Sequence, residues 1–153
     1  MEKIESFKVD HLNLFSGLYV SRVDSFKNTV ITTFDLRFTA PNREEVLSVN
    51  AMHTLEHLGA TYFRNSKLKS DVVYFGPMGC QTGFYLLLHG DMRAIDLLPY
   101  VLEFLDYVIA FSGEIPGATP KECGNYKSQD LALAKTYAKK YKEDLIKYER
   151  FEY

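Results

Sequence analysis

The segment His53-Thr54-Leu55-Glu56-His57 combines two imidazoles and a carboxylate in a pattern that can bind a metal. Residues four apart lie on the same face of a helix, so His53 and His57 can bind one divalent cation. Glu56 precedes the second histidine and lies near such a metal without having to bind it. A metal beside an unbound carboxylate is the outline of a reaction centre, so the motif predicts a metal-dependent enzyme.

A third protein ligand is needed, because a catalytic metal site normally has three protein ligands and one open position. The candidates are His11, His89, Cys80, Cys123 and several carboxylates. Both cysteines lie next to a glycine in turn-like segments. The residues alone leave open whether each cysteine is a ligand, a catalytic thiol or a buried apolar side chain.

The composition is that of an ordinary globular protein, with 46% hydrophobic and 25% charged residues among 153. We expect a single domain over residues 1–153, because the sequence contains no repeat, low-complexity stretch or linker. The net charge of −2 gives no electrostatic basis for binding nucleic acid or an anionic membrane. Neither is therefore expected as a partner.

The location expected from the sequence is the cytoplasm. The first seven residues contain no apolar signal-peptide core, and the apolar stretch 97–111 is interrupted by Pro99, Glu103 and Asp106. In the cytoplasm the two cysteines should be reduced. That favours ligand or acid–base roles over a disulfide.

Two strands and a helix are predicted to position the histidine motif. Residues 17–23 and 29–38 have strand character, and in the second strand Val30, Thr32, Phe34, Leu36 and Phe38 share one face. Asn42 then suits the N-cap of a helix over about residues 43–64, with Glu45 at the capping-box position. The buried stripe predicted from the spacing in this helix consists of Val46, Val49, Met52, Leu55 and Ala60.

The remaining sequence predicts two strands, over 71–75 and 82–89, and two helices, over 91–111 and about 128–148. A glycine-rich turn, 76–80, joins the strands, and a loop, 113–124, precedes the last helix. The stripe expected to be buried in the first of these helices consists of Ile95, Leu98, Leu102, Leu105 and Ile109. In the last helix it consists of Leu131, Ala134, Ala138, Tyr141 and Leu145.

The fold class predicted from these elements is α+β. Strands joined in pairs by short turns indicate a small antiparallel sheet, and the helices then cover one of its faces in a two-layer sandwich. The second face of the sheet is left to find a partner. A homodimer is therefore expected.

Two other functions fit the histidine motif. His-x-x-Glu-His is also the inverted signature of zinc peptidases, in which Glu56 would activate water for hydrolysis and neither cysteine would be needed. A non-enzymatic module could instead close a metal site with His53, His57, Cys80 and Cys123. The chain lacks the Cys-x-x-Cys pairs that are typical of closed structural sites.

Motifs distributed over nearly the whole chain match one family. They are Glu5-Ser6-Phe7, Asp10-His11, Tyr19-Val20, Asp35-Leu36-Arg37-Phe38, Pro41-Asn42, His53-Thr54-Leu55-Glu56-His57-Leu58, Pro77-Met78-Gly79-Cys80-Gln81-Thr82-Gly83 and Glu122-Cys123-Gly124-Asn125-Tyr126. With these motifs in this order, the sequence resembles the S-ribosylhomocysteine lyase (LuxS) family. Several motifs in one order are far more specific than the histidine motif alone.

The resemblance implies a role for each candidate residue. His53, His57 and Cys123 would bind one divalent metal per subunit, Fe²⁺ in the native state, with Zn²⁺ or Co²⁺ able to replace it. Cys80 and Glu56 would be the catalytic acid–base pair. The implied substrate-binding residues, some acting across a dimer interface, are Ser6, Phe7, His11, Arg37 and Arg64. The implied assembly is a homodimer of α+β sandwiches with two shared active sites.

The reaction implied by the resemblance cleaves the thioether of S-ribosylhomocysteine. The products are homocysteine and 4,5-dihydroxy-2,3-pentanedione, the autoinducer-2 precursor of quorum sensing. The carbonyl must migrate from C1 to C3 before β-elimination can expel the sulfur. Each migration needs a base, an acid and a Lewis acid for the enediolate, and Cys80 and Glu56 could divide the proton transfers.

Three features depart from the family pattern. Tyr74-Phe75-Gly76 stands where the family commonly has Asp-x-Ser, Gly59 replaces a usual Leu, and the segment between Arg64 and Asp71 is shorter. The missing Asp bears on how the amino-acid end of the substrate is held. The residues that carry the chemistry are all present, so the same reaction class is expected.

Overall fold

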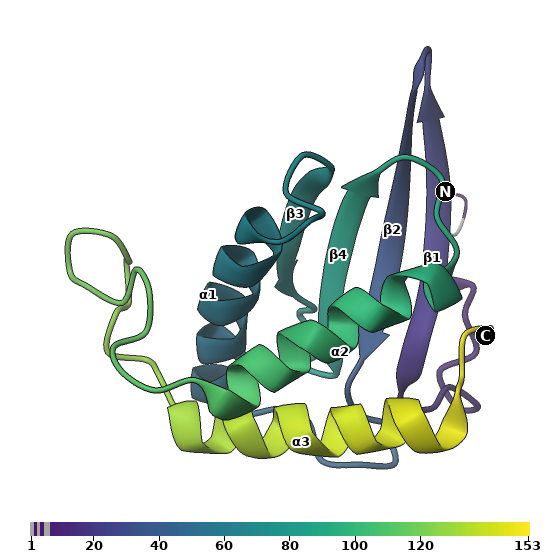
Figure 1. The fold of residues 1–153 in the computed structure, drawn as a ribbon. Coiled ribbons are helices and arrows are strands. Elements are labelled where there is room, and N and C mark those ends of the chain that lie inside the picture. The colour runs from purple at the N-terminus through teal and green to yellow at the C-terminus, as the bar shows by residue number, and fades with distance from the viewer. Residues whose placement is uncertain (1, 3, 5–6) are drawn as a thin grey trace.

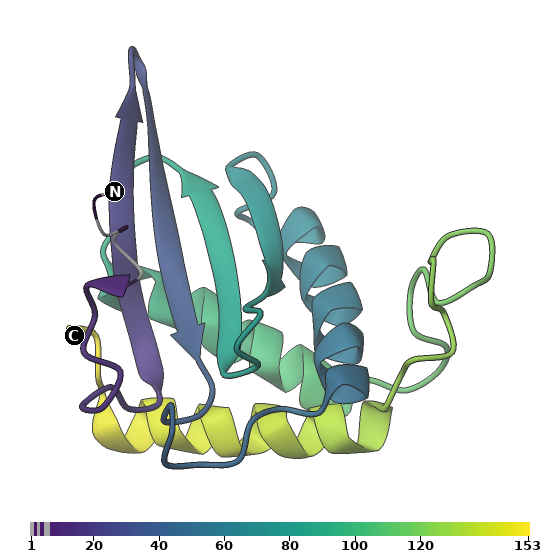
Figure 2. The ribbon, with the colours of Figure 1, turned by 180° about the vertical axis from the view of Figure 1, so that it is seen from behind.

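The computed structural model describes residues 2, 4 and 7–153. Within them the order is β1 (Gly17–Phe26), β2 (Thr29–Arg37), α1 (Val49–Asn65), β3 (Val72–Pro77), β4 (Gly83–His89), α2 (Ala94–Ala110) and α3 (Leu131–Tyr148). The strands form an antiparallel sheet in the order β1-β2-β4-β3, and the helices lie on one of its faces (Figures 1 and 2). The predicted α+β fold with helices on one face is therefore confirmed.

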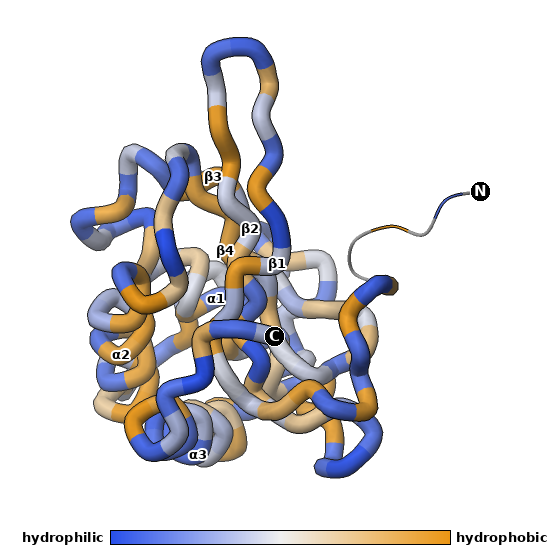
Figure 3. The backbone as a smooth tube through the Cα atoms, turned by 90° about the vertical axis from the view of Figure 1, so that its right-hand side faces the viewer, coloured by the Kyte–Doolittle hydropathy of each residue, from blue (hydrophilic) through white to orange (hydrophobic). Residues whose placement is uncertain are grey.

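Strand β2 lies inside the sheet, between β1 and β4, and presents different side chains to its two faces. Phe34 and Leu36 belong to the core under the helices. Because successive side chains in a strand point to opposite faces, Asp35 and Arg37 lie on the face that the helices leave uncovered. The hairpin of β1 and β2 extends beyond the other strands (Figure 3).

The core between sheet and helices is rich in aromatic rings. Phe75 of β3 stacks on Phe84 of β4 with ring centroids 5.2 Å apart, and Phe63 of α1 lies 5.0 Å from Phe104 of α2. Such offset and tilted pairs add to the stabilisation from burial itself. Phe63 also lies 5.3 Å from Phe75, so these rings hold α1 against β3 and α2 and set the position of the histidine motif.

Helix α1 begins later than the sequence predicted. Asn42 has a φ of 60°, in the left-handed region, so it is not the N-cap, and the predicted capping box with Glu45 is wrong. Instead Glu44 accepts a hydrogen bond from the Ala40 backbone N–H at 2.6 Å and closes a turn. The N-cap position is taken by Ser48.

The predicted buried stripes are mostly correct for α3 and partly correct for α1 and α2. In α3 Ala134, Ala138, Tyr141 and Leu145 are buried as predicted, and Leu131 is half-buried. In α1 Met52 and Leu55 are buried and Ala60 is half-buried, whereas Val46, which precedes the helix, and Val49 are exposed. In α2 Leu105 is buried as predicted, but Ile95 is exposed and Leu98, Leu102 and Ile109 are only half-buried. The buried residues of α2 are Ala94, Leu97, Val101, Phe104, Leu105 and Val108. Helix α2 is apolar on most sides, so spacing alone could not select its buried face.

Gly59 has a packing role in α1. A Cβ atom at this position would lie 2.2 Å from the Phe75 ring, a distance that no side-chain carbon tolerates. Glycine therefore lets α1 approach the strand that carries Phe75. Gly59 and the segment 74–76 are thus in direct contact.

We predict that Gly59→Ala destabilises the protein. Alanine gains about 1 kcal/mol of helix propensity, but the overlap with Phe75 should cost about 1–3 kcal/mol of overpacking. The free energy of unfolding from urea denaturation measures the balance. In a Phe75→Leu background the same substitution should be neutral or stabilising, and an equal loss in both backgrounds would contradict the proposed contact.

Candidate metal centre and active site

Backbone carbonyls fix the orientation of both histidine rings of the motif. Nδ1 of His53 lies 2.8 Å from the Ser128 carbonyl oxygen, and Nδ1 of His57 lies 2.7 Å from the Pro116 carbonyl oxygen. A carbonyl can only accept a hydrogen bond, so each Nδ1 carries the proton and donates it. Each Nε2 of a neutral ring therefore presents a lone pair.

The two Nε2 atoms face one another at 2.9 Å. Cys123 Sγ lies 3.4 Å from His53 Nε2, and the donor atoms of the three residues lie within 4.8 Å of one another. Lone pairs brought this close repel unless a cation or a proton lies between them. We call His53, His57 and Cys123 the metal-binding cluster.

The metal-binding cluster fits a divalent transition metal. Two neutral imidazoles and one thiolate suit Fe²⁺, Zn²⁺ and Co²⁺ alike, and three protein ligands leave a position open. The carbonyls that accept from both Nδ1 atoms are the usual outer partners of metal-bound histidines. The Asn125 backbone N–H donates to Cys123 Sγ at 3.4 Å.

The loop between α2 and α3 delivers Cys123 and the Pro116 carbonyl to the histidines. Gly117 has a φ of +71°, and a Cβ atom there would lie 3.3 Å from His57 Nδ1. Glycine is therefore suited to this position on two grounds, the left-handed backbone and the close approach to the ring. Figures 1 and 2 show this loop on the outer side of α1, away from the sheet.

Glu56 lies half-buried beside the metal-binding cluster. Together with His57 and Gly117 it lines a hollow of about 280 Å³. The Glu56 side chain therefore faces the same hollow as His57 of the metal-binding cluster. A carboxylate placed this way can carry a proton to or from a molecule in the hollow.

Cys80 lies in the turn between β3 and β4 and is exposed. Its Sγ lies 3.1 Å from Thr82 Oγ1 and 4.0 Å from Arg37 Nη1, and the same Nη1 donates to Thr82 Oγ1 at 2.6 Å. Because Arg37 donates to the Thr82 oxygen, the Thr82 proton is free to point at the sulfur. Arg37 and Thr82 thus place a positive charge and a hydroxyl beside the Cys80 sulfur.

A buried carboxylate holds Arg37 in place. Asp35 accepts hydrogen bonds from Arg37 Nη2 and, at 2.9 Å, from the Tyr153 hydroxyl, and both charged side chains are about 2% exposed or less. Burial raises the pKa of the Asp35 carboxyl, while the Arg37 charge and the two donors oppose that shift. We call Asp35, Arg37, Cys80 and Thr82 the Cys80 cluster.

The remaining predicted substrate-binding residues are not gathered at one point. His11 is half-buried, bonds through Nδ1 to the Val9 carbonyl at 2.9 Å, and is close enough to influence Asp35 electrostatically. Phe7 is 70% exposed. Arg64 donates to the Val73 carbonyl of β3 at 3.1 Å. Ser6 lies outside the described residues.

The contacts of the described residues thus divide the candidate metal-binding and proton-transfer side chains into two groups. The metal-binding cluster and Glu56 lie on α1 and its flanking loop. The Cys80 cluster lies on the uncovered face of the sheet and the β3–β4 turn. On α1, core residues such as Leu55 and Gly59 occupy roughly the opposite face from His53 and His57, at about 100° per residue.

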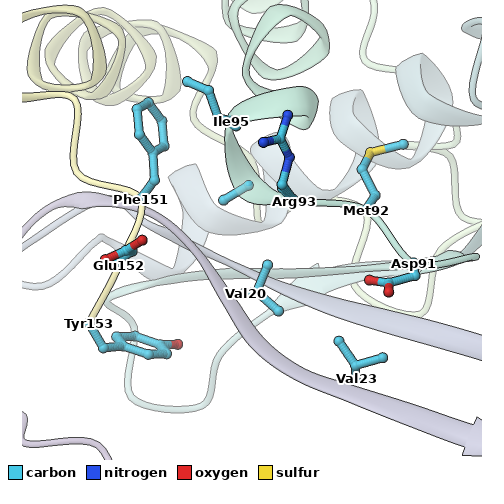
Figure 4. Close-up of a pocket in the computed structure, with 10 residues that line it drawn as sticks. Val20, Val23, Asp91, Met92, Arg93, Ile95, Phe151, Glu152 and Tyr153 are labelled. Carbon is cyan, nitrogen blue, oxygen red and sulfur yellow. The ribbon is translucent and has the colours of Figure 1, made fainter.

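Cavity size does not select the site. A larger hollow of about 570 Å³ lies at the outer edge of β1, between the start of α2 and the last three residues (Figure 4). Its lining includes Val20, Met92 and Phe151, and none of its ten lining residues is a candidate catalytic, metal-binding or substrate-binding residue. The smaller hollow beside Glu56 is the one that includes a residue of the metal-binding cluster, His57.

Comparison with known proteins agrees with this arrangement. The chain matches the sequence model of the S-Ribosylhomocysteinase (LuxS) family over residues 4–152. The chain belongs to this LuxS family. None of the helices in the described part of the chain combines the length and apolarity needed to cross a bilayer.

Relatives in several bacteria cover nearly the full chain, and each is named S-ribosylhomocysteine lyase. The protein of Finegoldia magna is 54% identical over 92% of this chain and 90% of its own length. That of Clostridium beijerinckii is 50% identical over 95% of this chain and 92% of its own length. That of Borreliella burgdorferi is 48% identical over 100% of this chain and 99% of its own length. Such identity over whole lengths supports the same LuxS fold throughout.

Several residues that shape the site had no assigned role in the sequence analysis. Asp35 carried a signal, since it lies two residues before Arg37 and therefore on the same face of a strand. Thr82, two residues after Cys80, carried a weaker one. The carbonyls of Pro116 and Ser128 and the hydroxyl of Tyr153 carried none, because their roles depend on tertiary contacts.

We predict that Asp35→Asn strongly destabilises the protein. The amide cannot balance the buried Arg37 charge, and breaking a buried ion pair from one side costs about 3–5 kcal/mol. The free energy of unfolding measured by urea denaturation tests this. Asp96→Asn, in an exposed pair with Arg93, is the matched control and should leave stability unchanged. Equal effects of the two substitutions would contradict the buried-pair argument.

Proposed function

We propose that this chain is a metal-dependent lyase that cleaves S-ribosylhomocysteine to homocysteine and 4,5-dihydroxy-2,3-pentanedione. The observation that carries the proposal is the metal-binding cluster, in which two fixed imidazoles and a thiolate converge beside Glu56 in a chain of the LuxS family. The relatives named S-ribosylhomocysteine lyase support the same activity here.

His53, His57 and Cys123 would hold the metal, which we expect to be Fe²⁺ with Zn²⁺ or Co²⁺ as substitutes. A bound divalent metal supplies a Lewis acid that polarises sugar oxygens. The protein's own part is to keep each histidine in the tautomer with a free Nε2. It does so through the carbonyls of Ser128 and Pro116, which hold the Nδ1 protons.

Cys80 and Glu56 would divide the proton transfers. Cys80 is exposed and has the Thr82 hydroxyl and the Arg37 guanidinium beside its sulfur, so as a thiolate it can take a proton from a sugar carbon. Glu56, half-buried in the hollow next to His57, can return protons to oxygens and protonate the leaving sulfur.

A second copy of the chain is needed to bring the two groups together. The metal-binding cluster joins α1 to the loop before α3, whereas the Cys80 cluster joins β2 to the β3–β4 turn, on the sheet face that the helices leave uncovered. Apolar side chains exposed near that face and in the N-terminal segment include Phe7, Leu12, Val73 and Tyr74. We propose a homodimer in which each active site combines the metal-binding cluster of one subunit with the Cys80 cluster of the other.

We predict that anaerobically purified, iron-loaded protein releases free thiol from S-ribosylhomocysteine. Glu56→Gln and Cys80→Ala should each lower the rate by about 10²–10⁴-fold, the usual contribution of a proton-transfer group. Thiol titration measures the release, and metal content is measured in parallel to show that both variants remain loaded. Thiol release no faster than with Glu56→Gln would contradict the lyase.

A peptidase would give the opposite pattern. It would use Glu56 to activate water and would tolerate the loss of both Cys80 and Cys123. A Cys123→Ala protein that kept its metal and hydrolysed peptides would therefore favour that alternative.

We also predict complementation between two inactive subunits. Cys80→Ala and His57→Ala homodimers should both be inactive, because each lacks one group in both sites. A heterodimer isolated by two different tags should regain about half of wild-type activity, since one of its two sites is intact. An inactive heterodimer of normal stability would show that both groups must come from one chain.

A further inference from the structure

The hydroxyl of Thr54 is buried in α1, next in sequence to the ligand His53. It donates to Gln129 Oε1 at 2.7 Å and accepts from the Asp130 backbone N–H at 2.9 Å. The Asn50 carbonyl lies farther away, at 3.2 Å. The single proton and one lone pair of this hydroxyl thus bind two consecutive residues of the segment before α3.

That segment supplies the carbonyl that orients His53. Ser128 accepts from His53 Nδ1 at 2.8 Å, and its own hydroxyl donates to the Asn50 side chain at 2.6 Å. The Gln129 amide nitrogen lies 3.3 Å from the same Nδ1. Residues 128–130 therefore contact α1 at three successive positions, and Thr54 binds two of them.

The start of α3 makes this link rigid. Asp130 is the N-cap of α3, and its carboxylate accepts from the Leu133 N–H at 2.9 Å. The Asp130 backbone N–H donates to the Thr54 hydroxyl. The hydroxyl thus connects the helix that carries both histidines to the first turn of the helix that follows Cys123.

We infer that Thr54 is a positioning residue of the metal centre: its hydroxyl holds residues 128–130 so that the Ser128 carbonyl fixes the tautomer and angle of His53. The inference rests on the proposed metal centre. Packing alone does not explain the residue. Valine has nearly the same shape and would fill the same buried space without a polar atom to satisfy.

Loss of the hydroxyl should act on metal affinity through this chain of contacts. The Asp130 N–H and the Gln129 amide would be left without their partner, so residues 128–130 would shift or admit water. The Ser128 carbonyl would then hold His53 less firmly. Removing outer partners of metal-bound histidines typically weakens metal binding by about 10–100-fold.

The experiment compares metal binding by Thr54→Val, Thr54→Ser and wild-type protein. Zn²⁺ affinity is measured by competition with a chromophoric chelator, and the absorption spectrum of the Co²⁺-loaded protein reports ligand geometry. Thr54→Val should bind Zn²⁺ at least about tenfold more weakly, with an altered Co²⁺ spectrum. Thr54→Ser retains the hydroxyl and should restore both.

Thr136→Val is the matched control. Thr136 lies on α3, and its hydroxyl donates to the Ala132 carbonyl at 3.2 Å, the same four-residue back-bond that Thr54 has available to Asn50. It has no contact with the metal-binding cluster. This variant should bind Zn²⁺ as the wild type does.

Two outcomes would overturn the inference. Thr54→Val could bind Zn²⁺ and Co²⁺ like the wild type, or it could lower only the melting temperature of the metal-free protein; either result means a structural role alone. If Thr54→Val does not fold, Gln129→Met gives the second test and should also weaken Zn²⁺ binding. Wild-type protein that binds neither metal would instead contradict the proposed metal centre.

Discussion

The approach of two imidazole nitrogens to 2.9 Å is the constraint on which the site depends. Backbone carbonyls accept the Nδ1 protons of His53 and His57, so in neutral rings both facing Nε2 atoms present a lone pair. Holding them together costs electrostatic energy unless a cation lies between them. The fold alone brings the two nitrogens together. Helix α1 places the histidines four residues apart, and backbone carbonyls in the segment before α3 fix the orientation of both rings. The lone pairs of both rings thus converge on the position that a divalent cation would take.

The sheet imposes a second constraint, this time on charge. Because β2 alternates its side chains, Asp35 and Arg37 lie together on the uncovered face and are buried there, partly beneath Tyr153. A buried guanidinium needs its carboxylate, and the pair in turn fixes which donor reaches Thr82 and Cys80. The thiol therefore has a fixed electrostatic environment although it is itself exposed. Strand alternation and burial therefore set the surroundings of a sulfur that the β3–β4 turn carries.

Local pattern predicted the elements well, and tertiary contacts account for what it missed. Strand β2 and the stripe of α3 follow directly from periodicity. The start of α1 could not be predicted this way, because the left-handed backbone of Asn42 and the turn closed by Glu44 depend on contacts with nearby segments of the chain. The three metal ligands came from motif and resemblance, and the structure brings all three together. The Ser128 and Pro116 carbonyls could not be predicted, since any residue type can supply a backbone oxygen.

Two of the three expected departures from the family pattern, at Gly59 and at residues 74–76, concern packing and one outer surface. Gly59 makes room for the Phe75 ring, and Gly76 makes room for the Tyr74 phenol, which a Cβ atom would meet at 2.0 Å. Tyr74 then lines a hollow of about 280 Å³ with Arg22 and Tyr85 on the uncovered sheet face. None of these side chains contacts His53, His57 or Cys123 in the described part of the chain. The substitutions therefore reshape the surface where a second copy and the substrate would meet, and they leave the proton-transfer and metal-binding groups as they are.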